Sequence, residues 1–527
     1  MQQPQAVREM TAEVLVIGGG PAAAWAAMAA AEAGVRVILV DKGYVGTSGA
    51  TAPANTGTWS PPPGEPMRAS IAARQPRTCG LADPEWAEAT LELVWQKLHW
   101  LAERGYPFPA DDTGKLYVAN LRGPDYMHFM RRLVLRAGVR IFDQHPALEL
   151  LRGEAGIAGA AGVNRQTGEP WRVRAGAVVL ATGGCAFGER MLGAAALTGD
   201  GYLMAAEAGA VLSGMEFSCQ YATAPAPSAM NKGLPFSWAS FYREDGTRLD
   251  TEGKDRYRVI GEALLQGPVY ARYDKAWPEL QGWLRQGQPN CFLPLDRDRV
   301  DPFGERWPVT LRCEGTVRGV GGIRLAGDDG ATGVPGLFAA GDAASRERLT
   351  GAISGGGGPN SSWAIASGNW AGRGAAAYAQ RNAGHVTGQI EALGGAGLRP
   401  NADVRREVSA DEALRLVREE MLPLDRNYFR TGPVLERSLE RLDASWAALR
   451  RHCRADGAAA VKAREAAALT ASSRWAYRSA LARTESRGMH RRSDHPETDP
   501  AFVCTFEASG LDEVRITARP VAWGAAA

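Results

Sequence analysis

The stretch Glu13-Val-Leu-Val-Ile-Gly-Gly-Gly-Pro-Ala-Ala23 decides the fold of this chain. A short apolar run, typical of a buried strand, leads directly into the pattern G-x-G-x-x-A, and a mostly alanine segment follows as far as Ala33. A second predicted strand, Val35-Arg-Val-Ile-Leu-Val40, ends at Asp41. Strand, glycine turn, helix, strand and acid in this order are typical of a βαβ unit that binds a dinucleotide.

Each part of this pattern has a physical reason. Gly18 permits the tight turn, Gly20 lets backbone N–H groups approach a pyrophosphate, and the small Ala23 allows the helix to lie close to the sheet. The positive end of the helix favours phosphates, and Asp41 can accept hydrogen bonds from ribose hydroxyls. The competing interpretation is a glycine-rich turn without a ligand, and the motif alone does not separate FAD from NAD.

Composition narrows the function classes. Sixty Lys and Arg residues balance 58 Asp and Glu, and no long run of one sign occurs, so nothing indicates binding to nucleic acid or to an anionic membrane. The seven cysteines include no C-x-x-C pair, so we predict no metal site and a reducing, cytoplasmic compartment. Glycines break both uncharged stretches, 14–31 and 350–372, so we predict no transmembrane segment.

Four further segments follow the first motif in a particular order along the chain. They are the strand ending in A-T-G-G (175–184), the run from Thr198 to Met215-Glu-Phe217, the strand ending at Asp342 (334–342), and the element E-S-R-G-x-H-x-x-x-D-x-P (485–496). In this order they resemble the fumarate reductase/succinate dehydrogenase flavoprotein family. That family includes L-aspartate oxidase and the flavoprotein subunit of adenylylsulfate reductase, and the resemblance covers roughly residues 12–500.

The resemblance implies an α/β fold with three parts. A doubly wound, Rossmann-like FAD-binding domain is expected from two separate pieces, 1–216 and 322–385. An α+β capping domain, 217–321, is inserted between them, and a helical C-terminal domain, 400–527, follows. The sequence Ser409-Ala-Asp-Glu412 agrees with this expectation because it is a helix capping box.

The family's contacts with FAD are expected at matching positions of this chain. They comprise the phosphate turn and ribose acid, the loop around the pyrophosphate and flavin edge, the A-T-G-G turn, and the residues near the ribitol and the flavin ring. These residues are Gly18, Gly20, Pro21, Ala22, Ala23, Asp41, Lys42, Ser48, Gly49, Ala50, Thr51, Ala181, Thr182, Gly183, Gly184, Asp200, Gly341, Asp342, Asn360, Ser361 and Ser362. For each serine alone, a helix cap is an equally good interpretation.

The chain departs from its relatives where they attach FAD and bind dicarboxylates. The fumarate and succinate enzymes attach FAD covalently to a histidine at the position of Ala50, so we expect non-covalent FAD here. Their substrate histidines are replaced by Tyr221 or Ala222, depending on the register, and near Val317. Ser354 replaces the arginine that clamps a carboxylate. These changes argue against succinate, fumarate and aspartate as substrates.

The candidate catalytic residues are Arg272, Tyr221 and Ser354. Arg272 can polarise a substrate or stabilise reduced-flavin charge, and Tyr221 lies at or beside a substrate histidine of the relatives. The competing interpretations are a surface salt bridge for Arg272 and core packing for Tyr221. Arg256 and Arg258 are candidates of the same quality as Arg272.

The leading functional hypothesis is an FAD-dependent oxidoreductase that carries out two-electron redox chemistry on a small polar substrate. Because the sequence shows no second redox centre, electrons must pass to oxygen, to a free acceptor or to a partner chain. The resemblance to the flavoprotein subunit of adenylylsulfate reductase implies a separate, ferredoxin-like iron–sulfur partner. A stand-alone flavin oxidase resembling L-aspartate oxidase is one alternative. A flavin-binding assembly subunit without catalysis is the other.

Overall fold

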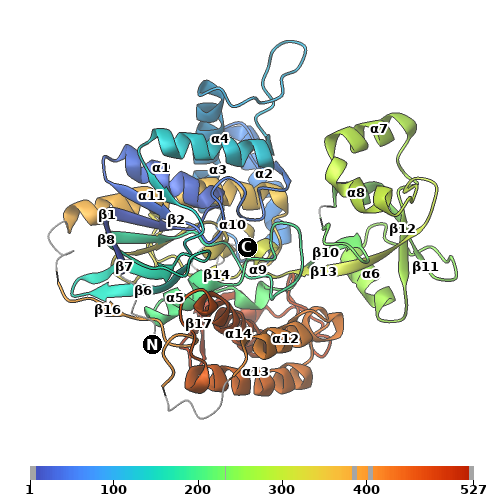
Figure 1. The fold of residues 1–527 in the computed structure, drawn as a ribbon. Coiled ribbons are helices and arrows are strands. Elements are labelled where there is room, and N and C mark those ends of the chain that lie inside the picture. Colours follow the sequence, from blue (N-terminus) through green and yellow to red (C-terminus); the bar gives the residue numbers. More distant parts are fainter. Residues whose placement is uncertain (1–6, 232, 383–387, 402–407, 522–527) are drawn as a thin grey trace.

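The computed structural model of the chain describes residues 7–231, 233–382, 388–401 and 408–521. Within these residues the central element is an eight-stranded sheet with helices on both faces (Figure 1). Its strands are β1 (Arg8–Ile17), β2 (Val37–Val40), β5 (Arg140–Phe142), β6 (Ala147–Gly153), β7 (Gly156–Val163), β8 (Pro170–Leu180), β15 (Leu337–Ala339) and β16 (Glu391–Ala392). Their order is β16-β6-β7-β8-β1-β2-β5, and β15 pairs with the end of β8.

The part of the sheet that carries the first motif is parallel. Strand β1 lies between β2 and β8, with Val14 opposite both Val37 and Ala177. Strands β5 and β15 extend this parallel core, whereas β6, β7 and β16 pair in antiparallel fashion. The expected α/β fold class with a parallel Rossmann-like core is therefore confirmed.

Helices cover both faces of the sheet. Helices α1 (Pro21–Glu32), α4 (Gly123–Arg136) and α11 (Gly357–Arg381) lie on one face, and α5 (Asp200–Glu207) lies on the other (Figure 1). Helix α1 contacts α11 closely because α11 offers glycines there: a Cβ on Gly372 would lie 2.2 Å from the carbonyl oxygen of Ala26. Other elements around this core are α2 (Glu65–Arg74), α3 (Pro84–Glu103), α10 (Glu347–Thr350), β3 (Asn55–Gly57) and β4 (Asn120–Arg122).

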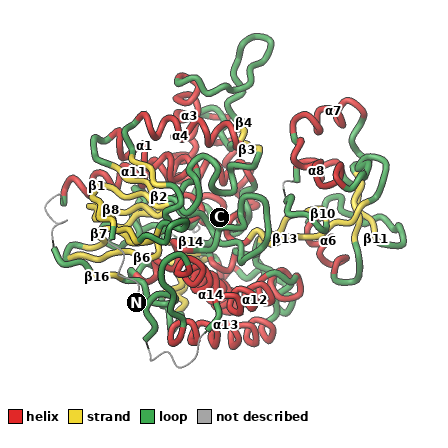
Figure 2. The backbone as a smooth tube through the Cα atoms, in the orientation of Figure 1, coloured by secondary structure: helices red, strands yellow, loops and turns green. Residues whose placement is uncertain are grey.

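A second sheet stands apart from the first (Figures 1 and 2). Its strands are β10 (Gln220–Pro225), β11 (Ser240–Arg243), β12 (Val269–Arg272) and β13 (Trp307–Glu314), in the order β10-β13-β12-β11. Helices α6 (Arg256–Leu264), α7 (Pro278–Gly287) and α8 (Pro289–Arg297) accompany it, and α9 (Gly315–Arg318) follows β13. These elements fall within the predicted capping segment, 217–321, whose boundaries stay a prediction.

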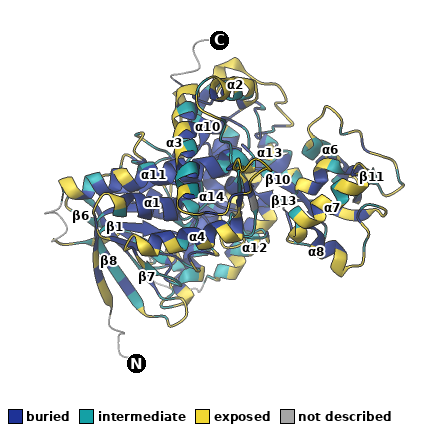
Figure 3. Ribbon diagram, turned by 90° about the horizontal axis from the view of Figure 1, so that it is seen from above, coloured by how far each residue is buried: buried dark blue, intermediate teal, exposed yellow. Residues whose placement is uncertain are grey.

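The C-terminal region is mostly helical, as expected. Its helices are α12 (Ala410–Met421), α13 (Gly432–His452) and α14 (Ala459–Ala482). The Ser409 hydroxyl accepts a hydrogen bond from the Asp411 amide at 3.2 Å, so the predicted cap is confirmed. Helix α14 is buried over most of its length (Figure 3), and no helix in the described ranges is long and apolar enough to cross a membrane.

The end of the chain adds strands that the sequence analysis did not predict. Strands β17 (Cys504–Ser509) and β18 (Arg515–Pro520) form a hairpin, and β17 pairs with β9 (Leu212–Ser213), which also pairs with β14 (Gly322–Ile323). Every second residue of β17 is buried, which is the two-residue period of a half-buried strand. The expected ends of the FAD-binding pieces and C-terminal domain at residues 1, 385 and 527 lie outside the described residues.

Candidate functional site

A cavity of about 1530 Å³ opens at the carboxyl ends of β1, β2 and β8. One wall comes from the first glycine motif and from the segments 41–51, 181–183, 341–342 and 357–361, and the opposite wall comes from the capping segment. Open α/β sheets bind ligands outside the carboxyl ends of their strands. The volume exceeds the usual 300–1,000 Å³ of a small-molecule pocket, so an extended ligand and a second molecule fit together.

The glycine turn is shaped for a group that approaches its backbone. Gly18 has φ +128°, and a Cβ there would lie 2.1 Å from the carbonyl oxygen of Ala181. A Cβ on Gly20 would meet nothing within 4 Å, so the turn is open toward the cavity. Helix α1 begins immediately afterwards with no side-chain cap and no acid in its first turn. Its first amide groups therefore suit a phosphate.

Asp41 and Lys42 stand at the end of β2 with different surroundings. The Asp41 carboxylate accepts hydrogen bonds from the Ser48 hydroxyl and the Gly43 amide, and burial raises its pKa above the ordinary value. The Lys42 ammonium is half-buried, and although desolvation lowers its pKa, its contacts with Asp200 at 2.7 Å and Glu465 at 3.1 Å raise the pKa above the ordinary value. Both residues line the cavity, and Lys42 is charged.

Polar atoms without a partner mark the wall near α11. Both side-chain polar atoms of Asn360 and the hydroxyl of Thr182 are buried and have no hydrogen-bond partner among the described residues. Burying such groups unpaired is unfavourable, so each is a place where a bound ligand would supply a partner. Together with the open glycine turn, this donor and acceptor set fits a nucleotide cofactor with phosphate, ribose and ring groups.

Most of the expected FAD-binding residues line this cavity, and three do not. Ala23, Gly184 and Ser362 lie outside its wall. The Ser362 hydroxyl accepts a hydrogen bond from the Trp59 amide at 3.0 Å, so it holds the neighbouring loop. A Cβ on Gly184 would lie 2.5 Å from the Thr316 hydroxyl, so this glycine serves close packing behind the wall.

The three candidate catalytic residues also lie outside the wall. Tyr221 is 1% exposed and its hydroxyl donates to the Leu422 carbonyl at 3.1 Å. Arg272 forms an ion pair with Asp274 at 3.2 Å, and the Ser354 hydroxyl accepts from the Gly356 amide at 3.3 Å. These positions support the competing interpretations of packing for Tyr221 and a salt bridge for Arg272.

The capping segment contributes polar wall residues that the sequence analysis missed. Glu314, at the end of β13, is 2% exposed and accepts a hydrogen bond from the Asn231 amide at 2.7 Å. Arg318 and Thr223 lie on the same wall. No motif marks these residues, because the strands that bring them together are about 90 residues apart in the sequence. Arg256 of the capping segment also lines the cavity, and the sequence analysis had named it as a possible catalytic residue.

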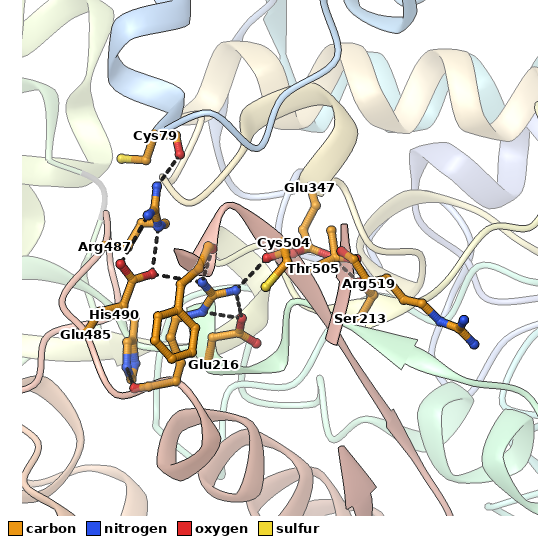
Figure 4. Close-up of polar contacts among 12 residues, drawn as sticks. Cys79, Ser213, Glu216, Glu347, Glu485, Arg487, His490, Cys504, Thr505 and Arg519 are labelled. Atoms are coloured by element: carbon orange, nitrogen blue, oxygen red, sulfur yellow. Dashed lines mark hydrogen bonds and ion pairs between the residues drawn. The ribbon is translucent and has the colours of Figure 1, made fainter. Parts of the chain in front are cut away.

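Ion pairs and hydrogen bonds at and beside the element 485–496 join the C-terminal region to the rest of the protein (Figure 4). Arg483 lies between Glu216 and Glu485, 2.9 Å from each carboxylate. Arg487 contacts Glu485 at 2.7 Å and donates to the carbonyl of Cys79 at 2.6 Å. These buried ion pairs join three distant segments of the chain, and the residues named lie outside the cavity wall.

His490 and Glu347 are buried beside these ion pairs (Figure 4). Burial, followed by the charge of Arg430, lowers the pKa of His490 well below its usual range, so its ring is neutral. Burial, followed by the charge of Glu216, raises the pKa of Glu347 to about 8. The Ser213 hydroxyl donates to one oxygen of Glu347, and the other oxygen has no partner among the described residues.

The fold and this cavity define an α/β protein of the dinucleotide-binding class. Comparison with protein families matches an FAD binding domain at residues 13–266 and the fumarate reductase flavoprotein C-terminal domain at residues 420–526. The chain belongs to the fumarate reductase/succinate dehydrogenase flavoprotein family. The predicted family, cofactor and enzyme class are thereby confirmed.

Individual relatives agree with this assignment. The fumarate reductase flavoprotein subunit of Mycobacterium tuberculosis is 26% identical over 490 residues, covering 78% of this chain and 79% of the relative. L-aspartate oxidase of Halobacterium salinarum is 29% identical over 272 residues, covering 47% of this chain and 51% of the relative. The structure of E. coli quinol fumarate reductase superposes with a TM-score of 0.80 at 20% identity, covering 98% and 97% of the two chains.

Proposed function

We propose that this chain holds FAD without a covalent bond and uses it for two-electron redox chemistry on a small polar substrate other than succinate or fumarate. We further propose that a separate iron–sulfur protein exchanges electrons with it. When bound, FAD supplies the two-electron chemistry. The chain's own residues hold the cofactor, shape the substrate wall and exclude water.

The observation that carries this proposal is the composition of the cavity wall. No histidine of the described residues lines the cavity, and Ala50 lies in the wall where the related fumarate and succinate enzymes attach FAD. Two apolar residues line the same cavity: Ala222, which in one of the two registers matches a substrate histidine of those enzymes, and Val317, which lies near the position of the other histidine. Neither side chain can pair with a carboxylate.

The proposed cofactor contacts follow from the wall. The glycine turn and the start of α1 hold the pyrophosphate, and Asp41 accepts from the ribose. Asn360 and Thr182 gain partners from the cofactor, since their polar atoms are buried and unpaired. Gly341, Asp342 and Ser361 complete the wall on the same side.

The proposed iron–sulfur partner is supported by the resemblance to the flavoprotein subunit of adenylylsulfate reductase. No group of three or more His, Cys, Asp or Glu residues within the described ranges can hold a metal ion. The M. tuberculosis relative is described as a flavoprotein subunit, which agrees with a multi-chain enzyme.

Three measurements on the purified yellow protein test the proposal. Acid precipitation should release all FAD to the supernatant, and FAD in the pellet would refute the non-covalent attachment. Anaerobic bleaching of the flavin band should occur with a member of a panel of amino, hydroxy, sulfonate and nucleotide-sulfate compounds, but not with succinate. Purification from the source should yield a brown iron–sulfur protein with the chain. Substrate-driven oxygen uptake with peroxide release would instead identify a stand-alone oxidase.

A further inference from the structure

The capping wall of the cavity contains three buried polar side chains from separate strands and loops. Thr223 lies on β10, Asn231 in the loop after it, and Glu314 at the end of β13, and each is 2% exposed. All three line the cavity. Strands β10 and β13 are neighbours, with Thr223 opposite Leu311, so the fold brings these side chains to one wall.

The hydrogen bonds within this group leave acceptors unused. The Asn231 amide nitrogen donates to Glu314 Oε1 at 2.7 Å and to the sulfur of Met191 at 3.2 Å. The side-chain oxygen of Asn231 and the hydroxyl of Thr223 are buried without a hydrogen-bond partner among the described residues. The Asn231 amide has already used its donors, and the Thr223 hydroxyl can accept as well as donate, so these three side chains together offer more acceptors than donors.

The charge of Glu314 is only partly balanced. Arg318 approaches Oε1 of Glu314 at 3.7 Å, which is an ion-pair distance but not a hydrogen bond. Asn231 contacts the same oxygen, and no described group donates a hydrogen bond to Oε2. A carboxylate placed against the free oxygen of Glu314 would meet a like charge that Arg318 only partly offsets, whereas an N–H or O–H group would donate to that oxygen.

We propose that Glu314, Asn231 and Thr223 form a substrate subsite that accepts hydrogen bonds and thereby selects molecules carrying an amine, amide or hydroxyl group there. This inference rests on the proposed function, because it assigns the substrate class of that cavity. It replaces the earlier candidates Arg272, Tyr221 and Ser354 with residues that line the cavity. Arg318 remains available to balance Glu314 when the bound donor is neutral.

A matched set of four-carbon probes tests the subsite on the FAD-loaded protein. Succinate, succinamide and 1,4-diaminobutane share one carbon skeleton and end in carboxylate, amide and ammonium groups. Binding is measured by isothermal titration calorimetry at physiological ionic strength. We expect succinamide or 1,4-diaminobutane to bind at least about tenfold more tightly than succinate, as expected when a buried acceptor gains a donor.

Two wall variants and one control assign this selectivity to its residues. Glu314→Gln keeps the size of the side chain and should reduce the preference over succinate about tenfold or more. Thr223→Val removes only the hydroxyl and should weaken the preferred probe severalfold, which provides a second test if Glu314→Gln does not fold. Glu262→Gln changes an exposed acid on α6 outside the cavity wall and should leave the preference unchanged.

The outcomes separate this inference from the proposed function. The subsite is refuted if neither donor probe binds, if succinate binds as tightly as they do, or if both wall variants retain the wild-type preference. A protein that bleaches with a substrate but shows no such selectivity refutes the subsite alone. A protein that prefers the donor probes but bleaches with no substrate refutes the redox function alone.

Discussion

Replacement of Glu347 by glutamine should make the protein more stable at neutral pH. Glu347 is 3% exposed, lies near the buried Glu216, and keeps one carboxyl oxygen without a partner among the described residues. Burial and Glu216 raise its pKa from 4.5 to about 8. Because the folded protein holds this proton more tightly than the unfolded chain, the stability contribution is complete below pH 4.5. It is lost as the pH rises toward 8.

The size of the effect follows from the interval between the two pKa values. At pH 7 the buried carboxyl is still protonated while the unfolded chain has released its proton, which costs about 3 kcal/mol at 1.36 kcal/mol per pH unit. An unfolding entropy of about 2.1 cal/mol/K per residue over 527 residues makes this about 3 °C in melting temperature. The glutamine side chain has no proton to release, so the free energy of unfolding of the variant does not fall in this pH range.

Thermal melts of wild type and Glu347→Gln, followed by circular dichroism between pH 5 and pH 8, measure the effect. The difference in melting temperature should be small at pH 5 and should grow to about 3 °C at pH 7 in favour of the variant. Glu262→Gln, an exposed change, is the control and should run parallel to wild type. A Glu347→Gln curve parallel to wild type across this range would show that the carboxyl is ionised in the folded protein.

Three further substitutions test the site. Gly18→Ala places a Cβ 2.1 Å from the Ala181 carbonyl oxygen at φ +128°, so the protein should purify without FAD, and a full flavin absorbance would contradict this. Asn360→Leu removes two buried unpaired polar atoms, so apo-protein stability should hold while FAD affinity falls about tenfold or more in a fluorescence titration. Tyr221→Phe removes the hydrogen bond to the Leu422 carbonyl, so the free energy of unfolding should fall by about 1 kcal/mol. Substrate-driven bleaching of the flavin should continue. Loss of bleaching would instead support a catalytic role for Tyr221.

The parts of the fold that were predictable from the sequence are those set by local rules. The glycine turn, the strands on either side of α1 and the cap of α12 each depend on residues within a few positions of one another. The hairpin of β17 and β18 was missed, although alternate burial along β17 agrees with a half-buried strand. Its pairing with β9 joins segments nearly 300 residues apart, and no local pattern contains that information.

The residues of the candidate site also fall into those set by local motifs and those set by long-range pairing. Most of the proposed FAD-binding positions line the cavity, and their residue types could be predicted because a backbone that comes close to a cofactor restricts them in short motifs. The wall from the capping segment could not be predicted, because Asn231 and Glu314 meet only through the pairing of β10 with β13. Tyr221 shows the limit most clearly: its neighbours Gln220 and Ala222 line the cavity, while its own side chain faces the C-terminal helices.

The close contact between α1 and α11 sets the order in which the chain can fold as it leaves the ribosome. Gly368 and Gly372 of α11 pack against Ala22 and Ala26 of α1. These glycines are synthesised only after the whole capping segment, so α1 leaves the ribosome long before the helix that buries it. At about 5–20 residues per second, the stretch from Ala26 to Gly372 takes roughly 17–70 s to synthesise. The apolar face of α1 is therefore a target for chaperones during synthesis, while the capping sheet, continuous in sequence, can form in the meantime.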